Sequence, residues 1–156
     1  MKYNVIVVGG GPGGYVSALY AAERGLCVAL IEKAELGGTC LNRGCIPTKA
    51  LVQSAHIMDL ITHADSFGIT VKDSAVQWGG VMNYKDSVVK KLTQGVSGLL
   101  RARKVEVFCG TATVLSASSL RVVTSDGAQK LLEADHIILA CGSYASRIPV
   151  PGAELP

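Results

Sequence analysis

The sequence predicts an α/β domain with a mainly parallel sheet, helices and a small β-meander, and three observations carry this prediction. Two short apolar runs near the start flank a helical pattern, as in a β-α-β unit. Of the 156 residues 49% are hydrophobic, yet no apolar run approaches the ~18 residues of a membrane span, so a buried parallel sheet accounts for them better. From residue 105 onward the pattern changes to that of short strands.

The first strand, expected at residues 4–8, leads into the spacing Gly9-x-Gly11-x-x-Gly14. Gly9 permits a tight turn out of the strand, and Gly11 lets a pyrophosphate approach the backbone. Gly14 lets the following helix pack closely on the sheet. Residues 9–14 contain five glycines, and each costs conformational entropy on folding. A turn that binds no ligand would leave this cost without a compensating interaction.

The helix after these glycines is expected to lie on the sheet through Ala18 and Ala22 and to end at Gly25. Residues 27–31 then form a second strand, and Glu32 follows the glycine turn by about the twenty residues typical of a carboxylate that binds a ribose hydroxyl. The free N–H groups of the helix would face the phosphates. The whole pattern predicts a Rossmann-like dinucleotide-binding unit, but it does not separate FAD from NAD, which share an ADP half.

Residues 37–49 contain Cys40 and Cys45, five positions apart. In an ideal helix such a pair has Cα atoms roughly 8.6 Å apart, beyond the ~7 Å limit for a disulfide. A disulfide therefore requires a distorted turn, which Gly44 and Pro47 can provide. A bond that closes so short a loop is strained and labile, which predicts a redox couple.

Other interpretations of the cysteines stay open. The pair could be small buried side chains, or half of a zinc site with His56 and His63, although the six residues between these histidines exceed the usual three to five. An odd count of five cysteines argues against a structural disulfide framework. The remaining three lie in apolar runs and are expected in the core: Cys27, Cys109 and Cys141.

The remaining elements follow from periodicity. Helices are expected at residues 49–61 and from 84 to about 103, the second with an apolar stripe that faces the core, and a loop at 67–77. The two histidines are expected at polar positions of the first helix and at its exit. Short strands are expected at residues 105–114, 120–124 and 129–132, and a buried strand at 136–140.

The charge pattern excludes several function classes. The net charge is +3, and the positive residues are not gathered with aromatic residues as a nucleic-acid surface requires. The amino terminus has one lysine and no apolar leader. We therefore expect a cytoplasmic protein in a reducing compartment, without a bound metal, a nucleic acid or a membrane as partner.

Together, the glycine motif at residues 9–14 and the cysteine motif at residues 37–49 resemble those of the class I pyridine nucleotide-disulphide oxidoreductases. Within that family, Leu41-Asn42 and residues 46–49 resemble the branch that oxidises dihydrolipoamide more than the branches that act on glutathione or mercuric ion. The resemblance implies bound FAD, with the flavin ring beside Cys45 and Cys40 as the outer thiol that exchanges with substrate. A glutathione- or mercuric-reductase-like enzyme, or a dinucleotide-binding module without redox work, remains the alternative.

The resemblance also implies which residues contact FAD. Cys141 stands where the family usually has threonine, and Ala112 would make a backbone contact to the adenine part. Lys49 would lie near the flavin, unless it is only a lysine on the surface of the helix. The implied contacts are Gly9, Gly11, Pro12, Gly13, Gly14, Glu32, Lys33, Gly38, Thr39, Cys40, Lys49, Ala112, Cys141, Gly142 and Ser143.

The resemblance covers this chain but only about the first third of the family's length. Residues 1–150 correspond to the FAD-binding domain with its redox disulfide, and residues 151–156 to the start of a linker. The family's NAD domain, returning flavin strand and dimer domain with a His-Glu pair have no counterpart here. For the whole protein the resemblance implies NAD as electron acceptor, a homodimer, and a lipoyl-bearing acyltransferase or lipoyl carrier protein of 2-oxoacid dehydrogenase or glycine-cleavage complexes as partner.

Overall fold

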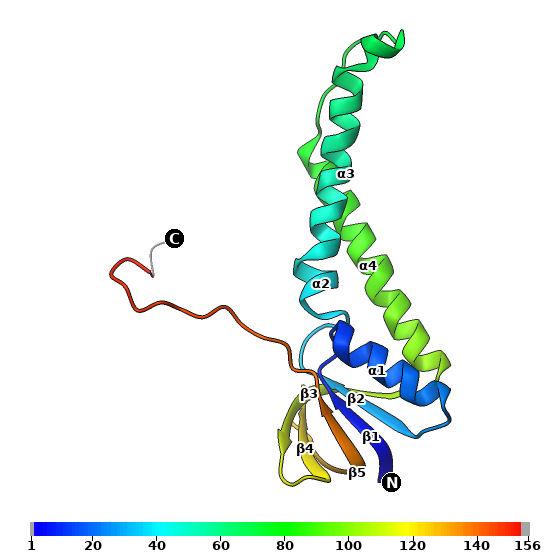
Figure 1. Ribbon diagram of the computed structural model, residues 1–156, viewed down its shortest axis with the longest axis vertical. Coiled ribbons are helices and arrows are strands. Elements are labelled where there is room, and N and C mark those ends of the chain that lie inside the picture. Colours follow the sequence, from blue (N-terminus) through cyan, green and yellow to red (C-terminus); the bar gives the residue numbers. More distant parts are fainter. Residues whose placement is uncertain (1, 154–156) are drawn as a thin grey trace.

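The computed structural model describes residues 2–153. A closed sheet forms one end of the molecule, α1 lies against it, and α3 and α4 project from it as a long pair (Figure 1). The expected linker at 151–156 is described as far as residue 153, and the rest of it lies outside the described residues. The elements are β1 (Lys2–Val8), α1 (Pro12–Glu23), β2 (Val28–Glu32), α2 (Gly38–Arg43), α3 (Cys45–Thr62), the short 3-10 helix η1 (Ala64–Phe67), α4 (Trp78–Ala102), β3 (Glu106–Val114), β4 (Ser119–Thr124) and β5 (Gln129–Leu139).

The sheet is mixed and closed. β1 pairs in parallel with β2 and with β5, and β2 pairs in parallel with β3. β4 pairs antiparallel with both β3 and β5 and so completes the ring. The α/β class is confirmed, whereas the expectation of a mainly parallel sheet with a distinct β-meander is replaced by one ring with parallel and antiparallel parts.

Two strands change partner along their length, which explains how the ring closes. In β3, residues 106–109 pair with β2 and residues 110–114 pair with β4. The change occurs at Gly110, where a Cβ atom would overlap the Val123 carbonyl oxygen. In β5, the first residues pair with β4 and the rest with β1, so the two strands expected at 129–132 and 136–140 are one continuous strand.

Both faces of β1 and β2 are largely buried, which explains their unbroken apolar runs. On β1, Val7 packs toward the helices and Ile6 packs inside the ring. On β2, Leu30 and Ile31 alternate in the same way. The helices therefore cover only the outer face, where the buried partners include Ala18, Leu41, Val96 and Leu100.

The expectation of a buried strand at 136–140 is wrong. Ile138 and Leu139 of β5 are 38% and 64% exposed. The reason is that, among the described residues, β5 packs mainly beside β1 and β4 and not under a helix.

The two long helices begin earlier than expected. α3 begins at Cys45 and not at residue 49, because Pro47 falls in its first turn, where a missing N–H costs no helical hydrogen bond. α4 begins at Trp78 and not at residue 84. His56 and His63 lie where expected, on α3 and at its C-cap.

The prediction that the apolar stripe of α4 faces the core is wrong for most of its length. Val96 and Leu100 are buried, but Tyr84, Leu92 and Leu99 are 46%, 40% and 54% exposed. For Tyr84 and Leu92 the reason is visible in Figure 1, where only the last turns of α4 reach the sheet and the rest runs beside α3. Leu99 lies in the last turns but is exposed beside the buried Leu100. The local period of a sequence does not reveal how far a helix extends beyond its sheet.

The three cysteines expected in the core are exposed. Cys27 precedes β2, Cys109 precedes the change of partner in β3, and Cys141 follows β5. Each therefore lies at a strand end or a strand transition, where one side of the backbone is uncovered. Their apolar sequence neighbours, and not the cysteines themselves, form the core.

Within residues 2–153, no helix combines the length and the apolar character that a membrane crossing needs. The described residues also contain no group of three or more His, Cys, Asp or Glu side chains that could hold a metal ion. His63 instead pairs with Asp59, with 3.3 Å between Nδ1 and Oδ1. The geometry thus offers no support for a zinc site made of the cysteine pair and the two histidines.

Candidate dinucleotide and thiol site

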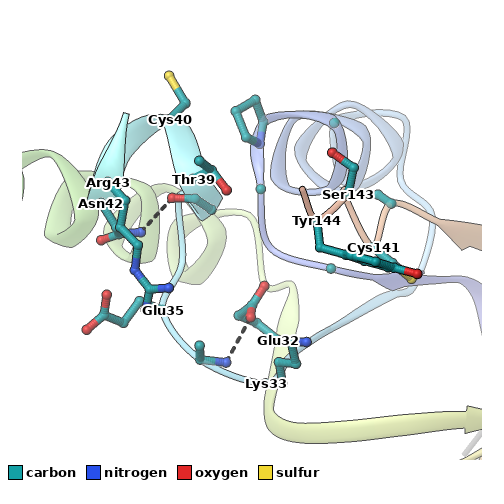
Figure 2. A pocket seen from close by; sticks show the side chains of 18 of the residues that line it. Glu32, Lys33, Glu35, Thr39, Cys40, Asn42, Arg43, Cys141, Ser143 and Tyr144 are labelled. Carbon is teal, nitrogen blue, oxygen red and sulfur yellow. Dashed lines mark hydrogen bonds between the residues drawn. The ribbon is translucent and has the colours of Figure 1, made fainter. Parts of the chain in front are cut away.

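A cavity of about 900 Å³ opens at the carboxyl ends of β1, β2 and β5, beside α2 (Figure 2). Most of the residues that the sequence predicts for the ligand line it. They are Gly9, Gly11, Pro12, Gly13, Glu32, Lys33, Gly38, Thr39, Cys40, Cys141, Gly142 and Ser143. Four elements distant in sequence therefore converge on one cavity, at the edge where open α/β sheets bind ligands.

The turn between β1 and α1 needs glycine for two different reasons. At Gly9, with φ 109°, a Cβ atom would overlap the Ala140 carbonyl oxygen, and at Gly14 it would overlap the Gly9 carbonyl oxygen. These two glycines are required by packing. At Gly11 a Cβ atom would meet only Gly38 Cα, at 3.7 Å, so this position is open toward the cavity.

The same turn presents backbone donors to the cavity. Among the described residues, the N–H groups of Gly11 and Gly13 have no acceptor, while the Gly14 N–H donates to the Gly11 carbonyl at 2.9 Å. Gly11 is the N-cap of α1, and no side chain caps the helix. The positive end of the α1 dipole therefore faces the cavity with free donors, an arrangement suited to a phosphate.

Glu32 is held in place by two backbone amides. Its Oε2 accepts from the Gly10 N–H at 2.6 Å, and its Oε1 accepts from the Ala34 N–H at 2.8 Å. An ionised carboxylate has about four lone-pair sites, so acceptor positions remain for ligand hydroxyl groups. The carboxylate is thus oriented at the cavity before any ligand binds.

α2 brings Cys40 to the cavity through a tightly packed loop. Gly37 is its N-cap in the left-handed conformation, with φ 97°. At Gly38 a Cβ atom would lie 2.7 Å from Gly11 Cα, so the loop touches the glycine turn. The Asn42 Nδ2 group donates to the carbonyls of Leu36 and Gly38, both at 3.0 Å.

The two motif cysteines lie on different helices. α2 ends at Arg43, Gly44 breaks the helix with φ −127° and ψ −108°, and Cys45 begins α3. A Cβ atom on Gly44 would lie 3.5 Å from Cys40 Cα, so the chain folds back on Cys40 at this point. This is the irregular turn that a disulfide between them requires. Both cysteines are free thiols in the structure, and the disulfide itself stays a prediction.

The two thiols interact. Hydrogen bonding to Cys45 raises the pKa of the Cys40 thiol, partial burial and the charge of Cys45 raise it further, and Lys49 lowers it. Cys40 therefore keeps its proton to a higher pH than an isolated cysteine.

Replacing Cys45 by alanine should lower the pKa of Cys40 toward its ordinary value, because the group that holds its proton is removed. The thiolate fraction of Cys40 at neutral pH, and with it the alkylation rate, should rise. The rate of iodoacetamide addition to Cys40 against pH, followed by mass spectrometry of the peptide, measures this. Cys27→Ala is the matched control and should leave the profile unchanged; an unaltered profile in Cys45→Ala would show that the thiols do not interact.

Some predicted residues lie elsewhere. Gly14 is buried beneath the turn, and the described lining of the cavity does not include Cys45, Lys49 or Ala112. Ala112 packs against the cluster inside the ring, and Lys49 is exposed on α3. The contacts of Lys49 and Ala112 with FAD stay predictions.

The sequence analysis missed several residues that line the cavity. Those beside a predicted residue could have been found from adjacency alone. Tyr144, beside the predicted Ser143, belongs to this group, whereas Arg43 carries no local signal and was identifiable only from the fold. The missed residues are Ala34, Glu35, Asn42, Arg43, Ala140, Tyr144 and Ala145.

Residues 3–156 match the protein family described as pyridine nucleotide-disulphide oxidoreductase. The chain is 44% identical over 156 residues to the dihydrolipoyl dehydrogenase of Chlamydia trachomatis serovar D, covering 99% of this chain and 33% of the relative. It is 44% identical over 148 residues to a dihydrolipoyl dehydrogenase of Bacillus subtilis, covering 94% and 32%. It is 45% identical over 149 residues to that of Geobacillus stearothermophilus, covering 96% and 32%.

The chain thus spans about a third of the length of these relatives. The match extends over the glycine turn, the carboxylate after β2 and the cysteine pair, which the structure places around one cavity. The chain belongs to the pyridine nucleotide-disulphide oxidoreductase family.

Proposed function

We propose that the cavity binds FAD and that the whole protein is a dihydrolipoamide dehydrogenase, in which Cys40 and Cys45 pass electrons from a dithiol to the flavin and on to NAD. One observation carries the proposal: an interacting thiol pair lies beside a cavity that has free phosphate-binding donors and an oriented carboxylate. The relatives named dihydrolipoyl dehydrogenase support the choice of substrate. A lipoyl-bearing acyltransferase or lipoyl carrier protein as partner, and a homodimer, belong to the same proposal.

The residues present fit FAD. The free N–H groups of Gly11 and Gly13 would hold the pyrophosphate, and Glu32 would accept from the hydroxyls of the adenosine ribose. The open face of Gly11 leaves room for the phosphates to approach the backbone. When bound, FAD supplies a two-electron acceptor next to the thiol pair.

The thiol pair would perform the exchange with substrate. In the oxidised protein, a substrate thiolate attacks the Cys40 sulfur, the Cys40–Cys45 bond breaks, and Cys45 leaves as a thiolate. The second thiolate of the substrate then attacks the substrate sulfur that is bonded to Cys40. This closes the cyclic disulfide of the product and releases the Cys40 thiolate, which then takes a proton. The substrate loses two electrons and the protein disulfide gains them, which leaves Cys40 and Cys45 as the reduced pair.

Anaerobic reduction of bound flavin tests the proposal. The full-length protein, reconstituted with FAD and freed of excess FAD, should show flavin absorbance that bleaches when dihydrolipoamide is added. A binding module without redox work would hold FAD but leave it oxidised. Tight binding of NAD without FAD, or reduction by glutathione but not by dihydrolipoamide, would contradict the assignment.

We expect these 156 residues alone to give only background NADH production from dihydrolipoamide, NAD and added FAD. Substrate thiols need a base within hydrogen-bond reach, and the two histidines on α3 are exposed and unsuited to that role. His63 ends α3, about 27 Å from Cys45 at 1.5 Å per residue. A steady-state assay, with the full-length Bacillus subtilis relative as positive control, measures this. Rapid NADH production that depends on Cys40 would show that the remaining two thirds of the family's length is dispensable.

A further inference from the structure

We propose that Tyr144 binds the dinucleotide by stacking its ring on the adenine, an inference that rests on the proposed function. Tyr144 lines the cavity just beyond β5. It is the only aromatic residue among the described residues that line the cavity. The other walls consist of glycine backbone, small side chains and charged groups, so no other lining residue offers an aromatic face to a planar ligand.

The ring of Tyr144 is exposed, as stacking on a ligand requires. Tyr144 is 92% exposed, and no hydrogen bond or ring contact engages its side chain among the described residues. Exposure alone would carry no conclusion, since single exposed apolar residues are common. Here the exposed ring also borders the cavity whose glycine turn and carboxylate fit a dinucleotide, and both ring systems of such a ligand can stack on tyrosine.

The position of Tyr144 favours the adenine over the flavin ring. Glu32, which would hold the ribose of the adenosine half, lines the same cavity. Tyr144 and Cys141 belong to the segment that follows β5, and Figure 2 shows Cys40 on α2, across the view from Glu32. The flavin ring is expected at the cysteine end, so the ring near Tyr144 would be the adenine.

Backbone contacts of the preceding residues hold Tyr144 near the cavity. The Ala140 N–H donates to the Val8 carbonyl at 2.8 Å, and the Cys141 thiol donates to the same carbonyl oxygen at 3.8 Å. Gly142, with φ 75°, then turns the chain. Tyr144 is thus tethered two residues beyond this turn, and ordering its ring fixes only two side-chain torsions.

The inference is tested by measuring how the chain binds FAD and two ligands that resemble its halves, ADP and FMN. The dissociation constants of FAD, ADP and FMN are measured by titration calorimetry for the wild type, Tyr144→Ala and Tyr144→Phe. Tyr84→Ala is the matched control, because Tyr84 is an exposed tyrosine on α4 outside the cavity. Circular dichroism of each variant checks that the fold is retained.

Tyr144→Ala should weaken FAD and ADP binding by about tenfold, within the range of base–aromatic stacking, and leave FMN binding unchanged. Tyr144→Phe and Tyr84→Ala should bind like the wild type. Unchanged FAD and ADP affinity in Tyr144→Ala would overturn this inference alone, as would a loss confined to FMN or a loss that phenylalanine does not restore. A wild type that binds neither FAD nor ADP would overturn the proposed function and this inference with it.

Discussion

Replacing Gly11 by valine should abolish FAD retention while the chain stays folded. The structure has room for a Cβ atom at this position, because the nearest atom outside the adjoining residues is Gly38 Cα at 3.7 Å. A branched side chain there would instead occupy the space where the pyrophosphate must meet the Gly11 and Gly13 N–H groups. We expect FAD affinity to fall on the order of a hundredfold, equivalent to about 2.8 kcal/mol.

The matched variant for this experiment is Gly14→Ala, which should lower the stability of the fold, whereas Gly11→Val should lower FAD affinity. Its Cβ atom would overlap the Gly9 carbonyl oxygen within the turn, and such overpacking typically costs about 1–3 kcal/mol of folding free energy. Flavin fluorescence titration measures binding, and urea denaturation measures stability. If Gly11→Val were the unstable variant and Gly14→Ala the stable one, the roles given to the two glycines would be reversed. The assignment of Gly11 to the pyrophosphate would then be contradicted.

Serine at either Cys40 or Cys45 should remove the reduction of bound flavin by dihydrolipoamide. The exchange needs a nucleophilic sulfur and a sulfur leaving group, and serine supplies neither. The rate of anaerobic flavin bleaching should fall on the order of a thousandfold or more, as for the loss of other catalytic nucleophiles. Cys45→Ser should still bind FAD, so a slower reduction of the flavin in this variant cannot be due to weaker FAD binding.

The other cysteines provide the controls for this prediction. Cys27→Ser and Cys109→Ser replace exposed thiols outside the cavity and should leave the bleaching rate unchanged. Differential thiol labelling before and after mild oxidation should show protection of Cys40 and Cys45 together. Protection that appears instead at Cys27, Cys109 or Cys141 would contradict the assigned pair.

The glycine turn and the carboxylate after β2 were predictable from sequence because their spacing is fixed by local geometry. Gly9 and Gly14 are forced by contacts within the β1–α1 turn and with Ala140, and Glu32 ends the strand that lies beside β1. The irregular turn between Cys40 and Cys45 was predictable for the same reason, because it depends on Gly44, the residue before Cys45; the redox role of the pair stays a prediction.

The parts that sequence did not reveal depend on distant partners. Whether residues 129–139 form one strand or two is decided by β1 and β4, which pair with different parts of it. The exposure of Tyr84 and Leu92 depends on how far α4 extends past the sheet. Arg43 lines the cavity only because α2 packs beside the glycine turn, which no local pattern could show.

The closure of the ring has a consequence for association between copies of the chain. An open sheet ends in strands with unpaired N–H and C=O groups, which act as templates for another strand. Here β4 connects β3 to β5, so each described strand has two neighbours and none is left as an outer strand. The backbone edges that stay unpaired are short, because residues 106–109 of β3 pair only with β2 and residues 110–114 only with β4; a further strand could pair only along such short segments.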